Sequence, residues 1–169
     1  IMVLIVYPLI LKFIVGRDPV AYIKGILPAQ MLAFSTSSSA AALPATIECS
    51  EKNNNIPEEV ASFILPLGAT INMDGTSLYQ AVATVFIAQA FGTDLDISQQ
   101  LMIVLTATLA SIGAAPVPGA GMVMLIIILQ SVGIAPEGLA LIFAVDRILD
   151  MCRTVVNVTG DATVAALIT

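Results

Sequence analysis

The sequence predicts an all-α membrane protein with two re-entrant helical hairpins and two spanning helices, one of them interrupted, arranged as an inverted repeat. Hydrophobic residues make up 58% of the chain and charged residues only 11%, whereas a soluble domain carries about 25% charged residues. Residues 97–136 carry no formal charge, which exceeds the roughly 20 residues that a spanning helix needs. Polar breaks recur at corresponding places in the two halves, which is typical of an inverted repeat around a midplane site.

Residues 1–15 form an apolar segment that we assign to the end of a transmembrane helix, because Gly and Pro in the 16–19 turn break it. Residues 17–53 form the first hairpin, with a Ser/Thr-rich tip at 35–39. Each half of this hairpin reaches at most about 27 Å, less than the roughly 30 Å of a bilayer core. The pair is therefore predicted to be re-entrant, followed by a polar linker at 51–57.

Residues 57–93 form an interrupted transmembrane helix. Asp74 is the only charge between Val60 and Thr93, within the pentapeptide Asn72-Met73-Asp74-Gly75-Thr76. A central Asp costs from about 2.5 kcal/mol upward in a bilayer, so it needs a partner or a cavity. Gly75 weakens the helix there and frees backbone carbonyls. Oxygen-rich, partly unwound backbone suits a dehydrated small cation.

The second half repeats this order. Residues 97–134 form the second hairpin, whose 111–121 tip holds two prolines and three glycines, and residues 137–169 form the last transmembrane helix. Such a tip breaks a helix, and it is tolerated at membrane depth only against protein or a water cavity. The 72–76 motif is echoed by Asn157-Val-Thr-Gly-Asp161 in the last helix.

A polar stripe runs along the last helix. At about 100° per residue its members fall inside one arc of about 100°, which must face the bundle interior: Asp146, Asp150, Arg153, Thr154, Asn157 and Asp161. One interpretation is a salt-bridge ladder, since Asp150 and Arg153 are three residues apart. The other is a binding site, in which Arg153 grips a substrate carboxylate, Asp150 takes an ammonium group, and Asn157 with Asp161 takes a cation.

Several classes of protein are excluded or disfavoured. The chain has no histidine and no Gly-x-Ser-x-Gly or Cys-x-x-Cys motif, and Cys49 and Cys152 lie far apart, so neither a catalytic dyad nor a zinc site is expected, and we expect no enzyme. Six basic residues without a patch argue against nucleic acid. Most of the acidic residues lie in predicted loops.

Orientation follows from the basic residues. Lys12, Arg17 and Lys24 surround the first loop, whereas the loops at 92–98 and 133–138 carry none, so the first loop should be cytoplasmic and the other two external. The first hairpin then opens from inside and the second from outside. Because the chain starts inside an apolar run without a Met or a charged leader, we expect it to be a fragment of a longer protein.

Four motifs, in this order, resemble the dicarboxylate/amino acid:cation symporter family, the sodium-coupled glutamate/aspartate transporters: Ser37-Ser38-Ser39, Gly68-Ala-Thr-Ile-Asn-Met-Asp-Gly-Thr76, Gly113-Ala-Ala-Pro-Val-Pro-Gly-Ala-Gly121 and Asp150-Met-Cys-Arg-Thr-Val-Val-Asn-Val-Thr-Gly-Asp161. The similarity covers essentially the whole chain. It implies that the chain begins within the sixth transmembrane helix and supplies most of a transport domain. It also implies a multi-pass protein of the plasma membrane, or of the cell inner membrane if bacterial, that forms a homotrimer through a scaffold outside this chain.

The resemblance also implies a substrate site on both tips, the interrupted helix and the last helix: Ser37, Ser38, Ser39, Met73, Thr76, Val117, Pro118, Gly119, Ala120, Gly121, Asp150, Arg153, Thr154 and Asn157. It implies three sodium sites. The first uses Gly68, Asn72, Asn157 and Asp161, and the second uses backbone oxygens of Thr70, Ser111, Ile112 and Ala114. The third involves Asn72 and Asp74, with partners from a missing helix. Sodium ions are the only cofactors implied.

The chain departs from the family pattern at four positions. An extra arginine usual in the family is absent from both of its positions, Ser37 and Met151, and Arg147 is the candidate substitute. Pro116 replaces a usual glycine and should stiffen the outer tip. Gln80 stands where proton-coupled members have Glu, and an amide cannot titrate, so proton coupling there is not expected.

The expected function is sodium-coupled symport of acidic amino acids, glutamate or aspartate, by alternating access. Arg153 argues against neutral amino acids, and Asp150 argues for a substrate with an amino group. The alternatives are a carrier of neutral amino acids or C4-dicarboxylates, and an uncoupled anion-conducting or non-transporting paralogue. Hairpins that can close the site on both sides favour alternating access over an open pore.

Overall fold

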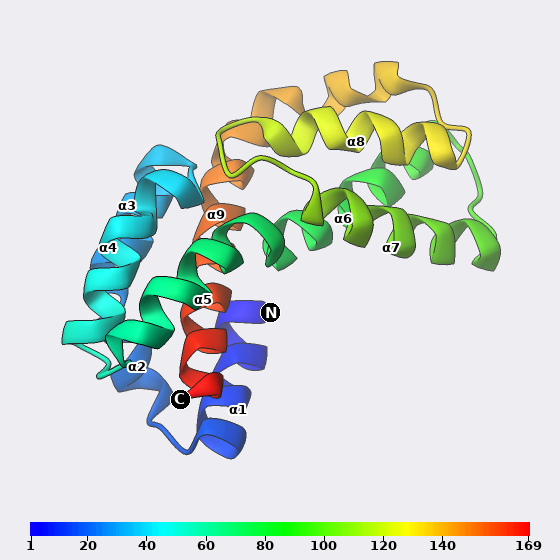
Figure 1. The fold of residues 1–169 in the computed structure, drawn as a ribbon. Coiled ribbons are helices and arrows are strands. Elements are labelled where there is room, and N and C mark those ends of the chain that lie inside the picture. Colours follow the sequence, from blue (N-terminus) through cyan, green and yellow to red (C-terminus); the bar gives the residue numbers. More distant parts are fainter.

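The computed structural model describes all 169 residues and contains helices but no strands, so the predicted all-α class is confirmed. Figure 1 shows the N- and C-termini near the same end of an elongated molecule, with the last helix running through both of its parts. In chain order the elements are η1 (Met2–Val6), α1 (Tyr7–Ile10), η2 (Leu11–Val15), α2 (Pro19–Gly25), α3 (Leu27–Thr36), α4 (Ser39–Lys52), α5 (Glu58–Ile71), α6 (Asp74–Ala90), α7 (Ile97–Ile112), α8 (Ala120–Ser131), η3 (Pro136–Leu139) and α9 (Ala140–Ile168).

The first apolar segment is a helix, in which π-type turns flank a short α-helical stretch. It ends at Gly16, whose φ of 77° is left-handed and therefore suits a residue without a side chain. Asp18 then caps α2 by accepting a hydrogen bond from the Val20 amide at 2.8 Å, and Pro19 occupies the first helical position.

The first half of the predicted 17–53 hairpin is divided at Ile26 into α2 and α3. Pro28 lies in the first turn of α3, where its missing amide proton costs no helical hydrogen bond. The helix α3 ends at Ser37, which adopts a left-handed φ of 53°. The hydroxyl oxygen of Ser38 then caps α4 by accepting from the Ala41 amide at 3.2 Å. Helices α3 and α4 pack against each other, so the Ser-rich segment is the tip of a helical hairpin.

The interruption expected within 57–93 falls at Asn72 and Met73, between α5 and α6. Gly75 was expected to weaken the helix at this point, but it lies in the first turn of α6. After a loop, Asp96 and Gln99 form a reciprocal capping box at the start of α7. Helices α7 and α8 pack together as a second helical hairpin whose tip is the 113–119 segment.

Two separate hydrophobic cores are joined by α9. One core contains Leu11, Tyr22 and Leu65 and includes Val158, Ala162 and Ala166 from the C-terminal half of α9. The other core lies among α6, α7 and α8 and includes Ile142 near the start of α9. The middle of α9 belongs to neither core, and its buried side chains there are polar. A polar site is therefore held between two apolar units.

No helix in the structure is both long enough and apolar enough to cross a membrane.

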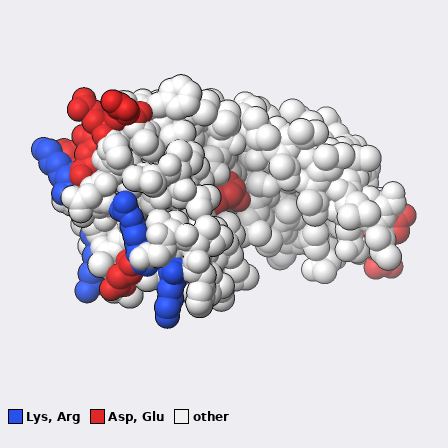
Figure 2. Space-filling model, turned by 60° about the horizontal axis from the view of Figure 1, so that its bottom comes forward, with Lys and Arg blue, Asp and Glu red and all other residues white.

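Apolar side chains are nevertheless widely exposed, among them Leu4, Phe13, Phe63 and Phe143, each more than two-thirds accessible. Figure 2 shows a face on which Lys and Arg gather at one end, while the middle of the molecule is almost free of charge. Exposed apolar surface on this scale indicates contact with lipid or with further protein.

Candidate functional site

A small polar cavity lies where the tips of the two hairpins meet the α5–α6 break and the middle of α9. Its volume is about 20 Å³, and it is lined by Ser37, Ser39, Met73, Thr76, Ala114, Ala115, Pro116, Val117, Ala120, Gly121, Asp150, Arg153, Thr154 and Asn157. A cavity needs about 10–15 Å³ to hold one water molecule. The surrounding side chains are therefore packed closely in this structure, and a larger ligand requires them to move apart.

The structure brings together most of the predicted substrate residues. All of them line the cavity except Ser38, Pro118 and Gly119. Ser38 and Gly119 instead make hydrogen bonds that shape the cavity. Ala115 and Pro116 also line the cavity but were not predicted, and Ala114, which was assigned to a cation site, faces it too.

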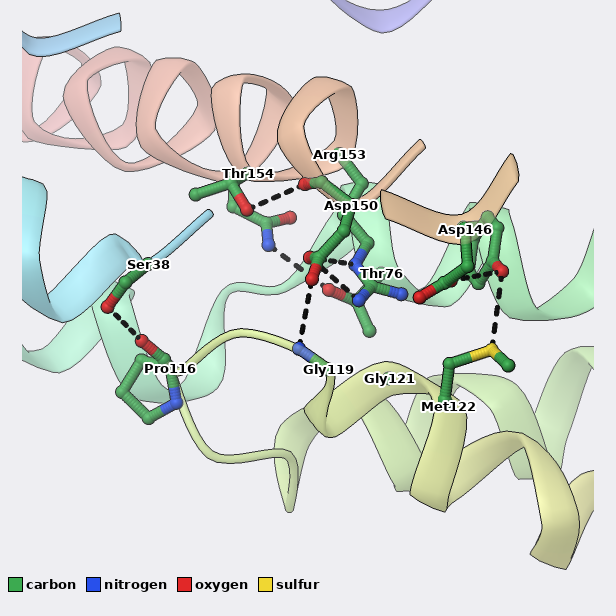
Figure 3. Close-up of polar contacts among 12 residues, drawn as sticks. Ser38, Thr76, Pro116, Gly119, Gly121, Met122, Asp146, Asp150, Arg153 and Thr154 are labelled. Carbon is green, nitrogen blue, oxygen red and sulfur yellow. Dashed lines mark hydrogen bonds and ion pairs between the residues drawn. The ribbon is translucent and has the colours of Figure 1, made fainter. Parts of the chain in front are cut away.

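The two hairpin tips are tied to each other across the cavity. The Ser38 hydroxyl donates to the Pro116 carbonyl at 2.8 Å (Figure 3), and the Ala40 amide donates to the same oxygen at 3.4 Å. Both bonds use backbone or short side chains, and the proline at 116 restricts the acceptor's conformation. The two hairpin tips are therefore in direct contact beside the cavity in this structure.

Arg153 and Asp150 form a buried ion pair at the centre of the site. The Nε and Nη2 atoms of Arg153 donate to Asp150 Oδ1 at 3.0 and 2.7 Å, and the two residues are only 6% and 4% exposed. The other carboxylate oxygen, Oδ2, accepts from the Gly119 amide at 2.9 Å (Figure 3). The pair expected by the salt-bridge interpretation is therefore formed, and it holds the second hairpin tip as well.

One donor of this pair is left free. Arg153 Nη1 is buried and has no hydrogen-bond partner, although a buried donor without a partner costs about 1–3 kcal/mol. Gly121 makes room for the guanidinium, because a Cβ atom at this position would overlap it. The free donor of a residue that lines the cavity can bind an anionic group such as a carboxylate.

Asn157 fixes the start of α6 against α9. Its Oδ1 accepts from the Gly75 amide at 2.8 Å, and its Nδ2 donates to the Thr76 hydroxyl at 3.1 Å. A Cβ atom at Gly75 would lie 2.6 Å from the Arg153 carbonyl oxygen. Only glycine permits this approach, so the role of Gly75 is close helix packing.

Three of the four residues predicted for the first cation site lie together. Asn72 Nδ2 donates to Asp161 Oδ1 at 2.9 Å, and a Cβ atom at Gly68 would lie 2.6 Å from the same oxygen. These residues line one groove between α5 and α9. Asn157, the fourth, lines the polar cavity instead.

The residues predicted for the second cation site do not share one cavity. Ser111 and Ile112 line a cavity with Asn72 and Asp74. Ala114 faces the polar cavity. Thr70 lies in neither lining; it is exposed, and its hydroxyl donates to the Leu67 carbonyl at 2.8 Å.

The two residues predicted for the third site, Asn72 and Asp74, face a common cavity. Asp74 accepts hydrogen bonds from the Tyr7 hydroxyl and from the Gly75 amide, the latter at 2.9 Å. Tyr7 was not predicted, and it lies in the first apolar segment. A half-buried carboxylate needs hydrogen-bond donors, and this tyrosine, one of three in the chain, is one of the two donors to Asp74.

Tyr79, near Arg153, was also missed. The Tyr79 ring lies under the guanidinium, whose carbon is 4.8 Å from the ring centre, and the Tyr79 hydroxyl donates to Asp146 at 2.6 Å. Gln80 is fully buried and donates to the Gly121 carbonyl at 3.3 Å, while its own side-chain oxygen has no partner. Arg147, by contrast, is exposed and does not line the cavity, so its expected role as a substitute arginine is wrong.

Comparison with known proteins identifies relatives over almost the whole chain. A model of the sodium:dicarboxylate symporter family matches residues 1–169. The chain is 51% identical to human excitatory amino acid transporter 5 over 97% of its length, covering 29% of that protein. It is 52% identical to mouse excitatory amino acid transporter 3 over 94% of its length, covering 30% of that protein.

A third relative, the putative sodium-dependent excitatory amino acid transporter glt-4 of Caenorhabditis elegans, is 48% identical over 97% of the chain. The chain spans 33% of that protein. The chain therefore spans about a third or less of the length of each of these three relatives.

The Tyr7–Asp74 contact gives a testable prediction. Tyr7→Phe removes the side-chain donor to a half-buried carboxylate and should lower the unfolding free energy of the full-length protein by about 1–3 kcal/mol. In an Asp74→Asn background the same change should cost clearly less, because the charged acceptor is gone. Thermal unfolding of the four proteins measures the coupling. Equal costs in both backgrounds would show that the contact contributes nothing to stability.

Proposed function

Because the chain belongs to the sodium:dicarboxylate symporter family, we propose that it forms the substrate- and cation-binding part of a sodium-coupled carrier of acidic amino acids. The observation that carries this proposal is the buried Arg153, whose free Nη1 donor belongs to a residue of a small polar cavity that also contains Asp150. The carrier activity belongs to a longer protein, of which the relatives indicate that this chain is about a third.

The substrate would replace the internal ion pair on both sides. A side-chain carboxylate binds the planar fork of Arg153, and an α-ammonium group binds the Asp150 carboxylate that Arg153 releases. Breaking a buried pair without replacing both partners costs about 3–5 kcal/mol. A substrate that carries a side-chain carboxylate in addition to its α-carboxylate and ammonium group avoids that cost.

This exchange distinguishes the competing substrates. A neutral amino acid supplies an ammonium group and a single carboxylate. If that carboxylate binds the polar groups of Ser39, Thr76 and Asn157, no anion remains for Arg153. A C4-dicarboxylate supplies the anion but leaves Asp150 uncompensated. Each leaves one buried charge without a new partner, and the acidic amino acid alone replaces both. The remaining polar groups of the cavity, on Ser39, Thr76 and Asn157, then bind the α-carboxylate and complete the site.

Sodium would bind the oxygen-rich positions around the α5–α6 break. The Asp161 carboxylate, the Asn72 amide and the Gly68 carbonyl offer oxygen ligands in one groove, and Asp74 offers another carboxylate beside Asn72. Hard cations prefer such ligands. Because Met73, next to Asn72, lines the substrate cavity, occupancy of the cation sites and of the substrate cavity should be linked.

In the membrane, the α3–α4 and α7–α8 pairs would be re-entrant hairpins, and α5–α6 and α9 the two spanning elements of an inverted repeat. Broken backbone at membrane depth is tolerated where it lines a cavity. Lys12, Arg17 and Lys24 would mark the cytoplasmic end. The remaining chain would supply the scaffold of a homotrimer in the plasma membrane, and the site would reach the two sides in alternation.

Substitution of the arginine tests substrate selectivity. Arg153→Cys in the full-length protein should weaken binding of labelled aspartate by at least about 30-fold, since truncating a buried hydrogen-bonded charge costs about 2–5 kcal/mol. Small neutral amino acids should still bind. Arg147→Cys, at an exposed position of the same helix, is the matched control. Aspartate binding within a few-fold of the parent in Arg153→Cys would refute the assignment.

Removal of a carboxylate tests the coupling to sodium. Asp161→Asn deprives the cation of its charged ligand and should shift the sodium titration of aspartate binding to higher concentration, about tenfold or more. Saturating sodium should restore part of the substrate affinity. Asp94→Asn, in an exposed loop, is the control. A titration of Asp161→Asn that overlays that of the control would remove Asp161 from the coupling mechanism.

The tip of the α7–α8 hairpin is the expected external gate. Its 113–119 segment makes few helical hydrogen bonds and is held by the contacts of Gly119 and Pro116. A cysteine introduced at the exposed position of Ala115 should react with an external thiol reagent about tenfold more slowly when sodium and aspartate are bound. A cysteine introduced at the exposed position of Ala41, in the first hairpin, should respond much less.

This experiment needs a background without Cys152, which is exposed and would react itself, whereas Cys49 is buried. Ala115→Cys and Ala41→Cys are therefore made in a Cys152→Ser protein whose aspartate binding is verified. Equal reactivity of the Ala115→Cys protein with and without both ligands would show that this tip is not the gate.

A further inference from the structure

Asp146 belongs to the polar stripe of α9 but does not line the substrate cavity, and no step of the proposed function uses it. It is half-buried and lies seven residues before Arg153, on the same face of the helix. Its carboxylate accepts a hydrogen bond from the hydroxyl of Tyr79, on α6, at 2.6 Å. The dashed lines in Figure 3 join Asp146 and Met122 of α8 through this hydroxyl.

Tyr79 connects Asp146 to the arginine. Its ring faces the Arg153 guanidinium at 4.8 Å from the ring centre, and its hydroxyl also lies 3.7 Å from the Met122 sulfur. A cation over an aromatic face is stabilised more strongly when both are shielded from water. The ring can hold the guanidinium plane only while its own orientation is fixed, and the hydrogen bond to Asp146 fixes it.

The other neighbours of the guanidinium do not fix the tilt of its plane. Asp150 binds Nε and Nη2 along one edge, and the backbone at Gly121 limits the approach from α8. Neither contact fixes the tilt of the plane about the Asp150 bonds. Since bidentate binding of a carboxylate depends on that plane, the surface beneath it matters for affinity.

We propose that Tyr79 and Asp146 are positioning residues, which hold the guanidinium of Arg153 in the plane that binds a substrate carboxylate. This inference rests on the proposed function, because it assumes that Arg153 is the carboxylate-binding residue. Neither residue touches the substrate. Asp146 acts through its hydrogen bond to Tyr79, and Tyr79 acts through its ring.

The test separates the ring, the hydroxyl and the carboxylate in the full-length protein. Labelled aspartate binding is measured at saturating sodium, and sodium binding is measured without aspartate. Tyr79→Phe keeps the ring and loses one hydrogen bond, so aspartate affinity should fall about 3- to 10-fold. Tyr79→Leu also loses the ring face, so the fall should reach about 10- to 30-fold.

Asp146 variants test the acceptor. Asp146→Ala should reproduce the loss of Tyr79→Phe, and in the Tyr79→Phe background it should add less than about twofold, because the shared bond is already absent. Asp146→Asn keeps an acceptor oxygen and should recover most of what Ala loses. Sodium binding without aspartate should stay within about twofold of the parent in all variants, a pattern that general destabilisation of the site would not give.

Two results would overturn the positioning role. One is aspartate affinity equal to the parent in Tyr79→Leu and Asp146→Ala. The other is an equal loss of aspartate and sodium binding in every variant, which would indicate a packing role only. A parent protein that binds sodium but no acidic amino acid would contradict the proposed function instead, so the two failures are distinguishable.

Discussion

The buried ion pair between Arg153 and Asp150 is the interaction around which the rest of the site is built. Removing two charges from water costs several kcal/mol for each ion, and their mutual attraction offsets this cost only when further hydrogen bonds complete the shell. Here the Gly119 amide binds the free oxygen of Asp150, and the Tyr79 ring covers one face of the guanidinium. Two residues of α9 thereby hold the start of α8, through Gly119, and the first half of α6, through Tyr79.

This arrangement requires backbones to approach α9 closely, and glycine makes the approach possible. Gly121 leaves space for the guanidinium, and Gly75 brings the first turn of α6 against the Arg153 carbonyl and the Asn157 amide. Because α9 alone enters both hydrophobic cores, its polar middle section is held between two apolar units. The polar site depends on that packing.

The sequence predicts the parts of this site that follow from local pattern. The stripe on α9 repeats with helical periodicity, and the residues it places on one face, from Asp150 to Asp161, are buried in the structure. The two tips were recognisable because Ser, Pro and Gly disfavour a helix there. The helix break lies at Asn72 and Met73, just before Gly75. The sequence could not show that Gly75 serves close packing instead, because its contact with α9 involves a second helix.

Contacts between distant segments could not be predicted in this way. Tyr7 and Asp74 are 67 positions apart, and nothing in the apolar run around Tyr7 marks it as a partner. Tyr79 likewise gives no local signal of its place beneath Arg153. Arg147 was considered as a substitute because it lies one turn before Met151. Helical periodicity places it close to the direction of Thr154, but it lies about two turns earlier along α9 and is exposed there.

The side chain of Asn72 shows what cation binding would require of the structure. Its NH₂ group donates to Asp161 Oδ1, and a donor cannot also coordinate a cation. A sodium ion bound by Asp161 would therefore require the amide to turn its oxygen toward the groove, since only that atom accepts. Asn72 and the adjacent Met73 form the break, and Met73 lines the substrate cavity. A cation held by Asn72 would thus lie one residue away from a side chain that faces the substrate, which gives the coupling of the two ligands a short physical path.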